Sequence, residues 1–185
     1  PRTPRDGMSP SISRFHSDGD EDIVINDAIP QLKQWIQKEQ CETAYDSMVD
    51  PFTKEAFYLK TLNKPNIMII GVTTDDDIFG GYLSIAVDCC ETNFQDRLHF
   101  LVSLESHGRC STPRFFQRRE EYLNRNAVRF CQSHPYGFLY FGSGLSEKSY
   151  IFLGNRQSNS YCNNLSKEYE DLEDTTLTGK NGYSS

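Results

Sequence analysis

Two apolar stretches joined by a short polar link constrain the fold of this chain more than any other feature. Asn66 to Val72 and Ile78 to Val87 are rich in aliphatic residues, and Thr73 to Asp77 between them is polar. A link of this length permits antiparallel pairing only, because a parallel crossover needs about a dozen residues or more. The paired glycines Gly80 and Gly81 predict a bulge or a close backbone approach. The sequence therefore predicts a β-hairpin.

Other segments of the chain add strands and two helices to this hairpin. Apolar residues at spacings of three and four predict a helix from about Ala28 to Gln40, and Asp50 with Pro51 predicts the start of a shorter helix that ends near Thr61. Apolar runs predict further strands at His99 to Leu104, Phe138 to Gly142 and Tyr150 to Leu153. The pattern favours an α+β, β-rich class, most simply a sandwich of antiparallel sheets.

The stretch from Thr112 to Cys131 fits two structures. Thr112 followed by Pro113 is a fair start for a helix, whereas Phe115 with Phe116 and the later Val128 are typical of strands. Both interpretations stay open at this point.

Length and composition indicate one domain with an N-terminal tail. Residues 1–22 combine Pro, Ser, Arg and Thr with few aliphatic residues, so we expect a disordered tail there and a single domain over residues 23–185. The net charge of −7 argues against binding nucleic acid over the whole surface. No run of about 20 apolar residues is present, and we expect a soluble protein of the cytoplasm, with the nucleus as the alternative.

Six arginines lie close together and are interleaved with aromatic residues. With two glutamates, Glu120 and Glu121, among them, the six arginines give this stretch a net charge of +4. Arginine and aromatic side chains bind phosphates and stack on bases, and they also make strong contacts in protein interfaces. A solvated charged face is the third interpretation. The six are Arg109, Arg114, Arg118, Arg119, Arg125 and Arg129.

An adjacent pair of cysteines is a candidate for a redox role. The six cysteines of the chain are most simply free thiols, and Cys89 and Cys90 are the only neighbours. A disulfide between them would be strained, because adjacent side chains of a strand point to opposite faces. A reactive thiolate needs a nearby cation, and Arg97 is the nearest in sequence. The alternative is one core cysteine and one surface cysteine without a role.

Cysteine and histidine also occur at the spacing of a zinc site. His107 and Cys110 form one pair with two residues between them, and Cys131 and His134 form another. Two such pairs would supply the four ligands of tetrahedral zinc. A domain of this length needs no metal for its stability, so we expect ordinary loop residues and no cofactor, with zinc as the weaker alternative.

Catalytic motifs are weak in this sequence. Gly142-Ser143-Gly144 lacks the spacing of a nucleophile elbow, and no glycine-rich phosphate loop is present. Glu105 and His107 follow a predicted strand and form a weak candidate for an acid–base pair. We therefore expect a protein that is more readily a binding domain than an enzyme.

Five segments occur in the order of motifs of the TLDc domain family, which the chain resembles from about residue 41 to residue 180. Ala44-Tyr45-Asp46-Ser47 is similar to the opening L-Y-x-S motif, and Phe79-Gly80-Gly81-Tyr82 is similar to the F-G-G-[YF] strand. Phe100 to Leu104 resembles the F-L-F-S-L strand, and Phe141 to Gly144 resembles the F-G-x-G segment. Ser160 to Asn164 resembles the closing section.

The chain departs from the family pattern at three places. Pro51 replaces the glycine of the D-G-F motif, and Ser149 stands where an acidic residue is usual. The last strand of the family has no clear counterpart near the C-terminus. We therefore expect this strand to be missing, which would leave its neighbour with unpaired backbone groups.

The resemblance implies a two-sheet antiparallel β-sandwich flanked by short helices. It also implies a role in protection from oxidative stress and, in several members, binding to the vacuolar ATPase. We therefore expect a non-enzymatic interaction domain whose partner is a protein, with a vacuolar ATPase subunit as the candidate, and no membrane insertion. The alternative is a transcriptional regulator that binds nucleic acid through the Arg109–Arg129 segment.

Overall fold

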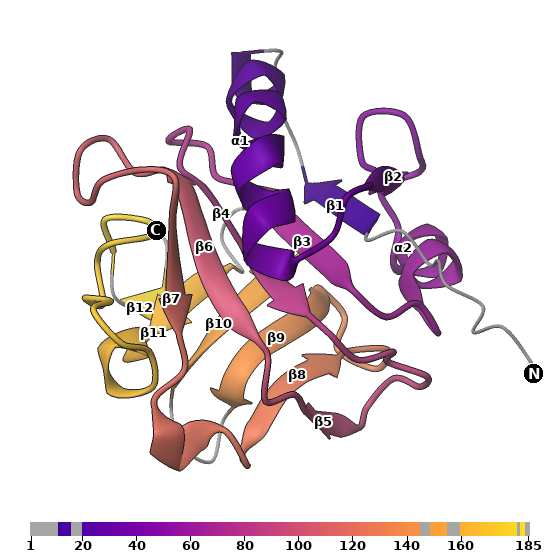
Figure 1. The fold of residues 1–185 in the computed structure, drawn as a ribbon. Coiled ribbons are helices and arrows are strands. Elements are labelled where there is room, and N and C mark those ends of the chain that lie inside the picture. Colours follow the sequence, from indigo (N-terminus) through magenta and orange to yellow (C-terminus); the bar gives the residue numbers. More distant parts are fainter. Residues whose placement is uncertain (1–10, 16–19, 145–148, 155–159, 181, 184–185) are drawn as a thin grey trace, which may run out of the picture.

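Two layers of β-sheet form the body of the protein (Figure 1). The computed structural model describes residues 11–15, 20–144, 149–154, 160–180 and 182–183. Within these residues the strands form two six-stranded sheets, sheet A and sheet B, which pack face to face. The predicted two-sheet sandwich of the α+β class is confirmed.

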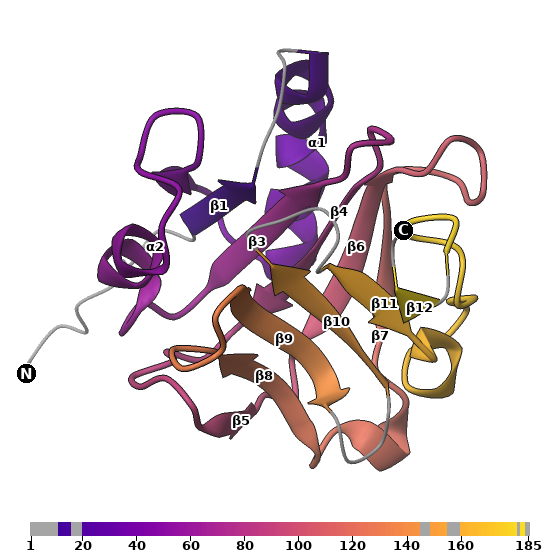
Figure 2. The ribbon, with the colours of Figure 1, turned by 180° about the vertical axis from the view of Figure 1, so that it is seen from behind.

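Sheet A contains most strands of the N-terminal half of the chain, and sheet B contains most strands of the C-terminal half. In spatial order, sheet A consists of β2 (Glu42–Asp46), β1 (Ser11–Phe15), β3 (Ile67–Val72), β4 (Ile78–Leu83), β6 (Phe100–Glu105) and β7 (Arg114–Gln117). Sheet B consists of β12 (Gly182–Tyr183), β11 (Tyr161–Asn163), β10 (Ser149–Gly154), β9 (Gly137–Gly144), β8 (Asn126–Phe130) and β5 (Asn93–Gln95). The view from behind shows sheet B in front of sheet A (Figure 2).

The hairpin predicted from the apolar stretches is the centre of sheet A. β3 and β4 pair antiparallel from Ile67 opposite Leu83 to Val72 opposite Ile78. Their turn is closed by the backbone N–H of Thr73, which donates to the carbonyl of Asp77 at 2.9 Å. The predicted close approach falls at Gly80, where a Cβ would lie 2.2 Å from the carbonyl oxygen of Ile69.

Two separate apolar layers hold sheet A in place. Along β3 the side chains alternate, so that Ile67 and Ile69 lie between the two sheets while Met68 and Ile70 face away from sheet B. The outer face is covered by α1 (Asp20–Ile36), which lies across sheet A in Figure 1. All four of these β3 side chains are buried, so β3 is a strand with two apolar faces.

Helix α1 is longer at its N-terminus than the sequence predicted. It begins at Asp20 and ends at Ile36. Ile25, Leu32 and Ile36 form its apolar face, and Ile36 is both the last residue of that face and the last residue of the helix. The acidic residues Asp20, Glu21 and Asp22 at its start had been part of the expected disordered tail. Neither helix of the described residues has the length and apolarity that a membrane span requires.

The N-terminal region also adds a parallel strand, which the sequence analysis did not predict. β1 lies between β2 and β3 and runs parallel to both. The α1 helix provides the crossover from β1 to β2 that a parallel pair requires. The expectation of disorder over residues 1–22 therefore differs from the structure at residues 11–15 and 20–22. Residues 1–10 and 16–19 lie outside the described part of the chain.

The ambiguous segment before Cys131 contains two strands. β7 begins directly after Pro113, and a short 3₁₀ helix at Glu120–Tyr122 separates β7 from β8. The helix that Thr112 and Pro113 would have started is therefore absent from this described stretch. β7 pairs with β6, which buries Phe116 between the sheets.

The second helix and the C-terminal strand also differ from the predictions. α2 (Lys54–Thr61) begins three residues later than expected, because the side chain of Thr53 and not that of Asp50 accepts the bond from the N–H of Ala56. Asp50 instead binds Lys60 at 2.7 Å. At the other end of the chain, β12 pairs antiparallel with β11, so a strand is present where none was expected.

The close approach at Gly80 leads to a prediction about stability. We expect Gly80→Ala to lower the free energy of unfolding by about 3 kcal/mol or to prevent folding, because the added methyl group meets backbone atoms that cannot move aside. Gly71→Ala, on the adjacent strand, is the control: its Cβ would meet Leu153 at an ordinary 3.7 Å. Denaturant unfolding should show a change below about 1 kcal/mol for the control. Equal effects would contradict the account.

Candidate functional site

We call the stretch Arg109–Arg129 the cationic segment. Arg118 is its only arginine whose side chain is fully enclosed. Its Nη2 lies 2.6 Å from Oε1 of Glu168, and neither side chain is exposed to solvent. The guanidinium also donates to the carbonyls of Arg125 and Asn126, at 3.3 and 2.8 Å, and to the hydroxyl of Ser143 at 3.3 Å. The prediction that Arg118 contacts a partner is therefore wrong for this residue, because the side chain lies inside the protein.

The pair between Arg118 and Glu168 joins segments far apart in the sequence. Arg118 follows β7, Ser143 belongs to β9, and Glu168 follows the 3₁₀ helix at Leu165–Lys167. Glu168 also accepts a bond from the backbone N–H of Ser143 at 2.9 Å. Burial raises the pKa of Glu168 in spite of the opposing effect of Arg118. Breaking such a pair would leave an uncompensated charge away from water.

Most of the other five arginines have partners of their own. Arg109 forms an ion pair with Asp77, Arg114 with Asp171 at 3.2 Å, and Arg129 with Glu91 at 2.5 Å. Arg119 donates to the carbonyl of Ser166. Arg125 is exposed and has no carboxylate partner within the described part of the chain. The carboxylates therefore neutralise much of the charge that the sequence shows as a cluster.

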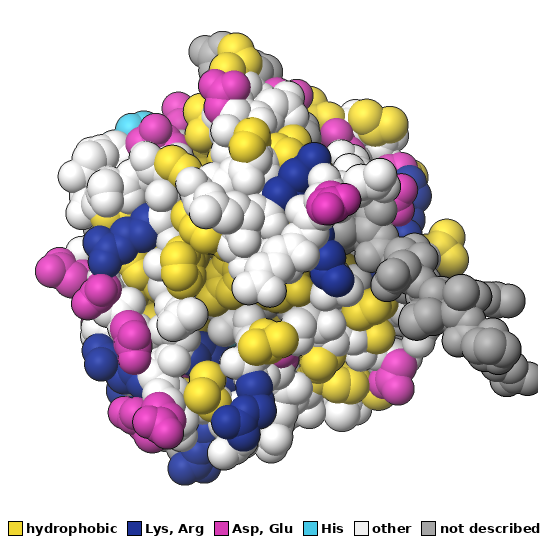
Figure 3. Space-filling view, in the orientation of Figure 1, with side chains coloured by type: hydrophobic (Ala, Val, Ile, Leu, Met, Phe, Trp, Pro, Cys, Tyr) yellow, Lys and Arg dark blue, Asp and Glu magenta, His cyan; other side chains and the backbone are white. Residues whose placement is uncertain are grey.

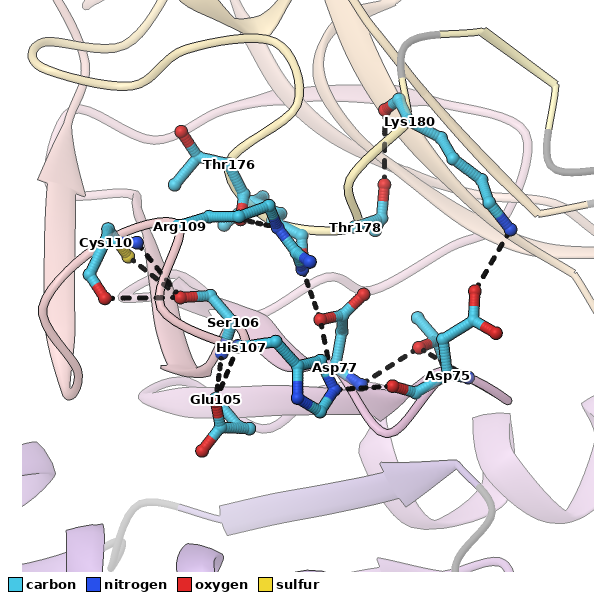
Figure 4. Close-up of polar contacts among 12 residues, drawn as sticks. Asp75, Asp77, Glu105, Ser106, His107, Arg109, Cys110, Thr176, Thr178 and Lys180 are labelled. Atoms are coloured by element: carbon cyan, nitrogen blue, oxygen red, sulfur yellow. Dashed lines mark hydrogen bonds and ion pairs between the residues drawn. The ribbon is translucent and has the colours of Figure 1, made fainter.

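A group of polar side chains ties the turns of sheet A to the C-terminal segment (Figure 4). We call it the rim cluster, and it comprises Asp75 and Asp77 of the β3–β4 turn, His107 and Arg109 of the β6–β7 turn, and Lys180. Arg109 donates to Asp77 and to the carbonyls of Thr176 and Leu177. Lys180 lies 3.0 Å from the carboxylate of Asp75. The rim cluster thus holds three chain segments together.

Within the rim cluster, Asp77 is the buried member. Its side chain is 1% exposed, and burial raises its pKa while Arg109 acts in the opposite direction. The ring of His107 is half-exposed, and its Nε2 lies 2.6 Å from the carbonyl of Asp75. Each of the five side chains of the rim cluster thus has at least one partner within the protein.

The candidate acid–base pair does not form. The carboxylate of Glu105 accepts the backbone N–H groups of Ser106 and His107, at 2.8 and 2.7 Å, and does not contact the imidazole ring. These backbone bonds hold the pKa of Glu105 below its usual range. A general acid must retain a proton near neutral pH, and the lowered pKa of Glu105 does not suit that role. Its two backbone hydrogen bonds stabilise the turn instead.

The adjacent cysteines lie in different environments. Cys89 is exposed, whereas Cys90 is half-buried against the apolar layer between the sheets. Burial raises the pKa of the Cys90 thiol, and the side chain of Arg97 binds Asn124 at 3.0 Å. The cation that the sequence offered for activation is thus engaged elsewhere. The environment of Cys90 favours an unreactive thiol.

The four residues of the zinc alternative are engaged in separate contacts. The described residues contain no group of three or more His, Cys, Asp or Glu side chains that could hold a metal ion. Cys110 lies by the hydroxyl of Ser106, and His107 faces Asp75. Cys131 is buried, and burial raises its pKa to about 12. His134 packs edge-on against Phe152, with the ring centres 4.9 Å apart.

A buried histidine was missed by the sequence analysis. The ring of His99 is bonded at both nitrogens, to the carbonyl of Tyr82 at 2.7 Å and to the hydroxyl of Tyr169 at 2.9 Å. Burial and the nearby charge of Arg118 lower its pKa to about 4. The sequence placed His99 at the start of a strand but gave no sign that Tyr169, far along the chain, would partner it.

Exposed apolar side chains gather on one segment of the surface. Val49 and Leu59 are 82% and 85% exposed, and Met48 and Phe52 are also exposed. All four belong to the β2–α2 turn or to α2, and we call them the β2–α2 surface. In Figure 3 hydrophobic side chains are visible over this region as separate spots among charged side chains. Four large apolar side chains exposed within twelve residues of the sequence make this segment a candidate interaction surface.

The two packed sheets and their flanking helices define a domain of the α+β, β-sandwich class. The family model of the TLDc domain matches residues 18–183. The chain therefore belongs to the TLDc domain family. No curated protein is a significant match to the chain.

The buried ion pair between Arg118 and Glu168 leads to a prediction about the stability of the fold. We expect Arg118→Met to lower the free energy of unfolding by about 3 to 5 kcal/mol, because Glu168 would remain buried without a partner. Arg125→Met, at the exposed arginine of the same segment, should change it by less than about 0.5 kcal/mol. Urea unfolding of both variants measures the difference. A small effect at Arg118 would show that the pair does not stabilise the fold.

The buried His99 predicts how stability depends on pH. Its pKa is about 4 in the folded chain and about 6.5 when unfolded, so between these values the unfolded chain binds the extra proton. This contribution to stability is present above pH 6.5 and is lost as the pH falls, with a slope of at most about 1.4 kcal/mol per pH unit.

The matched variant for this prediction is His99→Gln, which lacks the titrating ring. We expect its unfolding free energy to fall less steeply than that of the unaltered chain between pH 7 and pH 5, measured by urea unfolding at each pH. Parallel curves would show that His99 is not held neutral in the fold.

Proposed function

We propose that this chain is a non-enzymatic interaction domain of the oxidation-resistance type, and that it binds a protein partner through the β2–α2 surface. The observation that carries the proposal is the exposure of Met48, Val49, Phe52 and Leu59 on one short segment. Burying large apolar side chains of this kind supplies most of the energy of protein interfaces.

The charges around this surface favour an apolar partner. Lys60 is paired with Asp50, and the Nζ of Lys54 donates to the carbonyls of Gln132 and His134 at 2.7 and 2.6 Å. Phe52 stacks on Phe138, with ring centres 5.3 Å apart, which anchors this part of the surface to the core. With its cations engaged, the surface suits an apolar, weakly charged partner.

Membership of the TLDc family supports a role in protection from oxidative stress. We infer that the partner is a protein of that response, and that a vacuolar ATPase subunit is the first candidate. The chemistry of the described residues agrees with binding more than with catalysis, because Glu105 and His107 stabilise a turn and burial raises the pKa of the Cys90 thiol.

The nucleic-acid alternative has less support. Phosphate binding needs available cations, whereas Arg109, Arg114 and Arg129 face carboxylates and Arg118 is buried. A protein that neutralises several phosphates loses affinity steeply with salt. Binding through the β2–α2 surface should instead change little between about 50 and 200 mM salt.

Substitutions on the β2–α2 surface test the proposal. We expect the double variant Val49→Ser with Leu59→Ser to bind purified vacuolar ATPase at least about ten-fold more weakly, because two exposed apolar contacts are lost. Leu98→Ser is the matched control, since Leu98 is 68% exposed but follows β5 in another part of the sequence. Biolayer interferometry measures the affinities.

Two results would reject parts of this proposal. If Leu98→Ser weakens binding as much as the double variant does, the β2–α2 surface is not the binding surface. If the unaltered chain does not bind the vacuolar ATPase at all, that candidate partner is excluded.

A further inference from the structure

The β1 strand occupies an unusual place in sheet A. It lies between β2 and β3 and pairs in parallel with both, from Ser11 opposite Glu42 and Ile67. Its pairing with β3 runs in unbroken register to Phe15 opposite Gly71, whereas its pairing with β2 shifts after Ile12. Both edges of β1 are therefore used for backbone pairing.

The sequence of β1 does not suit a strand in this position. A parallel strand inside a sheet is ordinarily a nearly continuous apolar run. β1 reads Ser-Ile-Ser-Arg-Phe, with polar residues at three of its five positions, whereas β3 reads Ile-Met-Ile-Ile-Gly-Val. The structure shows β1 paired through its backbone along both edges, and backbone hydrogen bonds do not depend on the identity of the side chain.

The rest of sheet A supports β3 independently of β1. β3 pairs along its whole length with β4, and its side chains are buried in both apolar layers. Helix α1, which follows β1 in the chain, packs on the sheet through Ile25, Ala28 and Leu32. If β1 left its place, β3 would present an apolar edge with unpaired N–H and C=O groups, and such edges recruit other strands.

We propose that the slot between β2 and β3 is an acceptor site for an extended peptide strand, and that two copies of this chain exchange their Ser11–Phe15 segments through it. A second copy is the occupant that fits best, because its segment has the same sequence and reproduces the register with β3 residue for residue. Exchange of an identical element keeps every backbone bond and is a low-cost route to a dimer. The proposal does not depend on the partner inferred above.

The chain's own segment competes with any segment from another molecule. A tethered strand acts at an effective concentration in the millimolar range. A free peptide should therefore bind the unaltered chain weakly and should bind much more tightly to a chain whose own β1 cannot pair. This difference separates an acceptor site from a strand that is a fixed part of the sheet.

The experiment uses the full chain carrying Ile12→Pro and a fluorescent peptide of residues 9–17. Proline removes a backbone donor and is excluded from the inside of a sheet. Ile12→Val keeps the donor and is the matched control. Fluorescence anisotropy should show at least about ten-fold tighter binding to the proline variant than to the control, and no binding of a peptide with the same proline. Equal affinities for the two variants would overturn the acceptor site.

Two measurements on the unaltered chain keep the proposal testable if the proline variant does not fold. Hydrogen exchange should show weaker protection for the amides of β1 than for those of β4 and β6, because β1 leaves by local opening. Sedimentation at millimolar concentration should detect a dimer. Protection of β1 equal to that of β4, or a chain that stays monomeric at that concentration, would overturn the exchange.

Discussion

The ion pair between Arg118 and Glu168 is the interaction on which the arrangement of the C-terminal half depends. It brings the guanidinium of Arg118 and the carboxyl group of Glu168 together where neither side chain is exposed to solvent, so each side chain requires the other. Backbone bonds continue the connection on either side, from Arg119 to the carbonyl of Glu168 and from Glu170 to the carbonyl of Gln117. The segment after β11 is thereby fixed to the end of β7, and His99 lies beside it as a neutral ring bonded to Tyr169.

These contacts give the arginines of the cationic segment a role in the fold. In the sequence the segment resembles a surface for phosphates or for an acidic partner, but in the fold its arginines join loops to strands. The rim cluster does the same at the turns of sheet A, where Arg109 binds the buried Asp77. We propose that recognition uses the exposed apolar side chains around Val49 and Leu59 and the strand edges of sheet A.

The sequence predicted what depends on near neighbours. The hairpin of β3 and β4 followed from the length of its link, and the close approach at Gly80 followed from the paired glycines. Contacts between distant segments could not be read in this way. Nothing near Arg118 indicates that it, and not Arg125, turns inward, because Glu168 lies about fifty residues away. β1 was missed because its polar composition is that of a tail.

A double-mutant cycle on the buried pair tests the central claim most directly. The free energies of unfolding are measured for the unaltered chain, Arg118→Met, Glu168→Gln and the double variant. The account predicts that the two substitutions are strongly non-additive, with a coupling above about 1.5 kcal/mol, because each alone leaves a buried group without its partner. Effects that add to within about 0.5 kcal/mol would show that the two side chains act independently and would contradict the account.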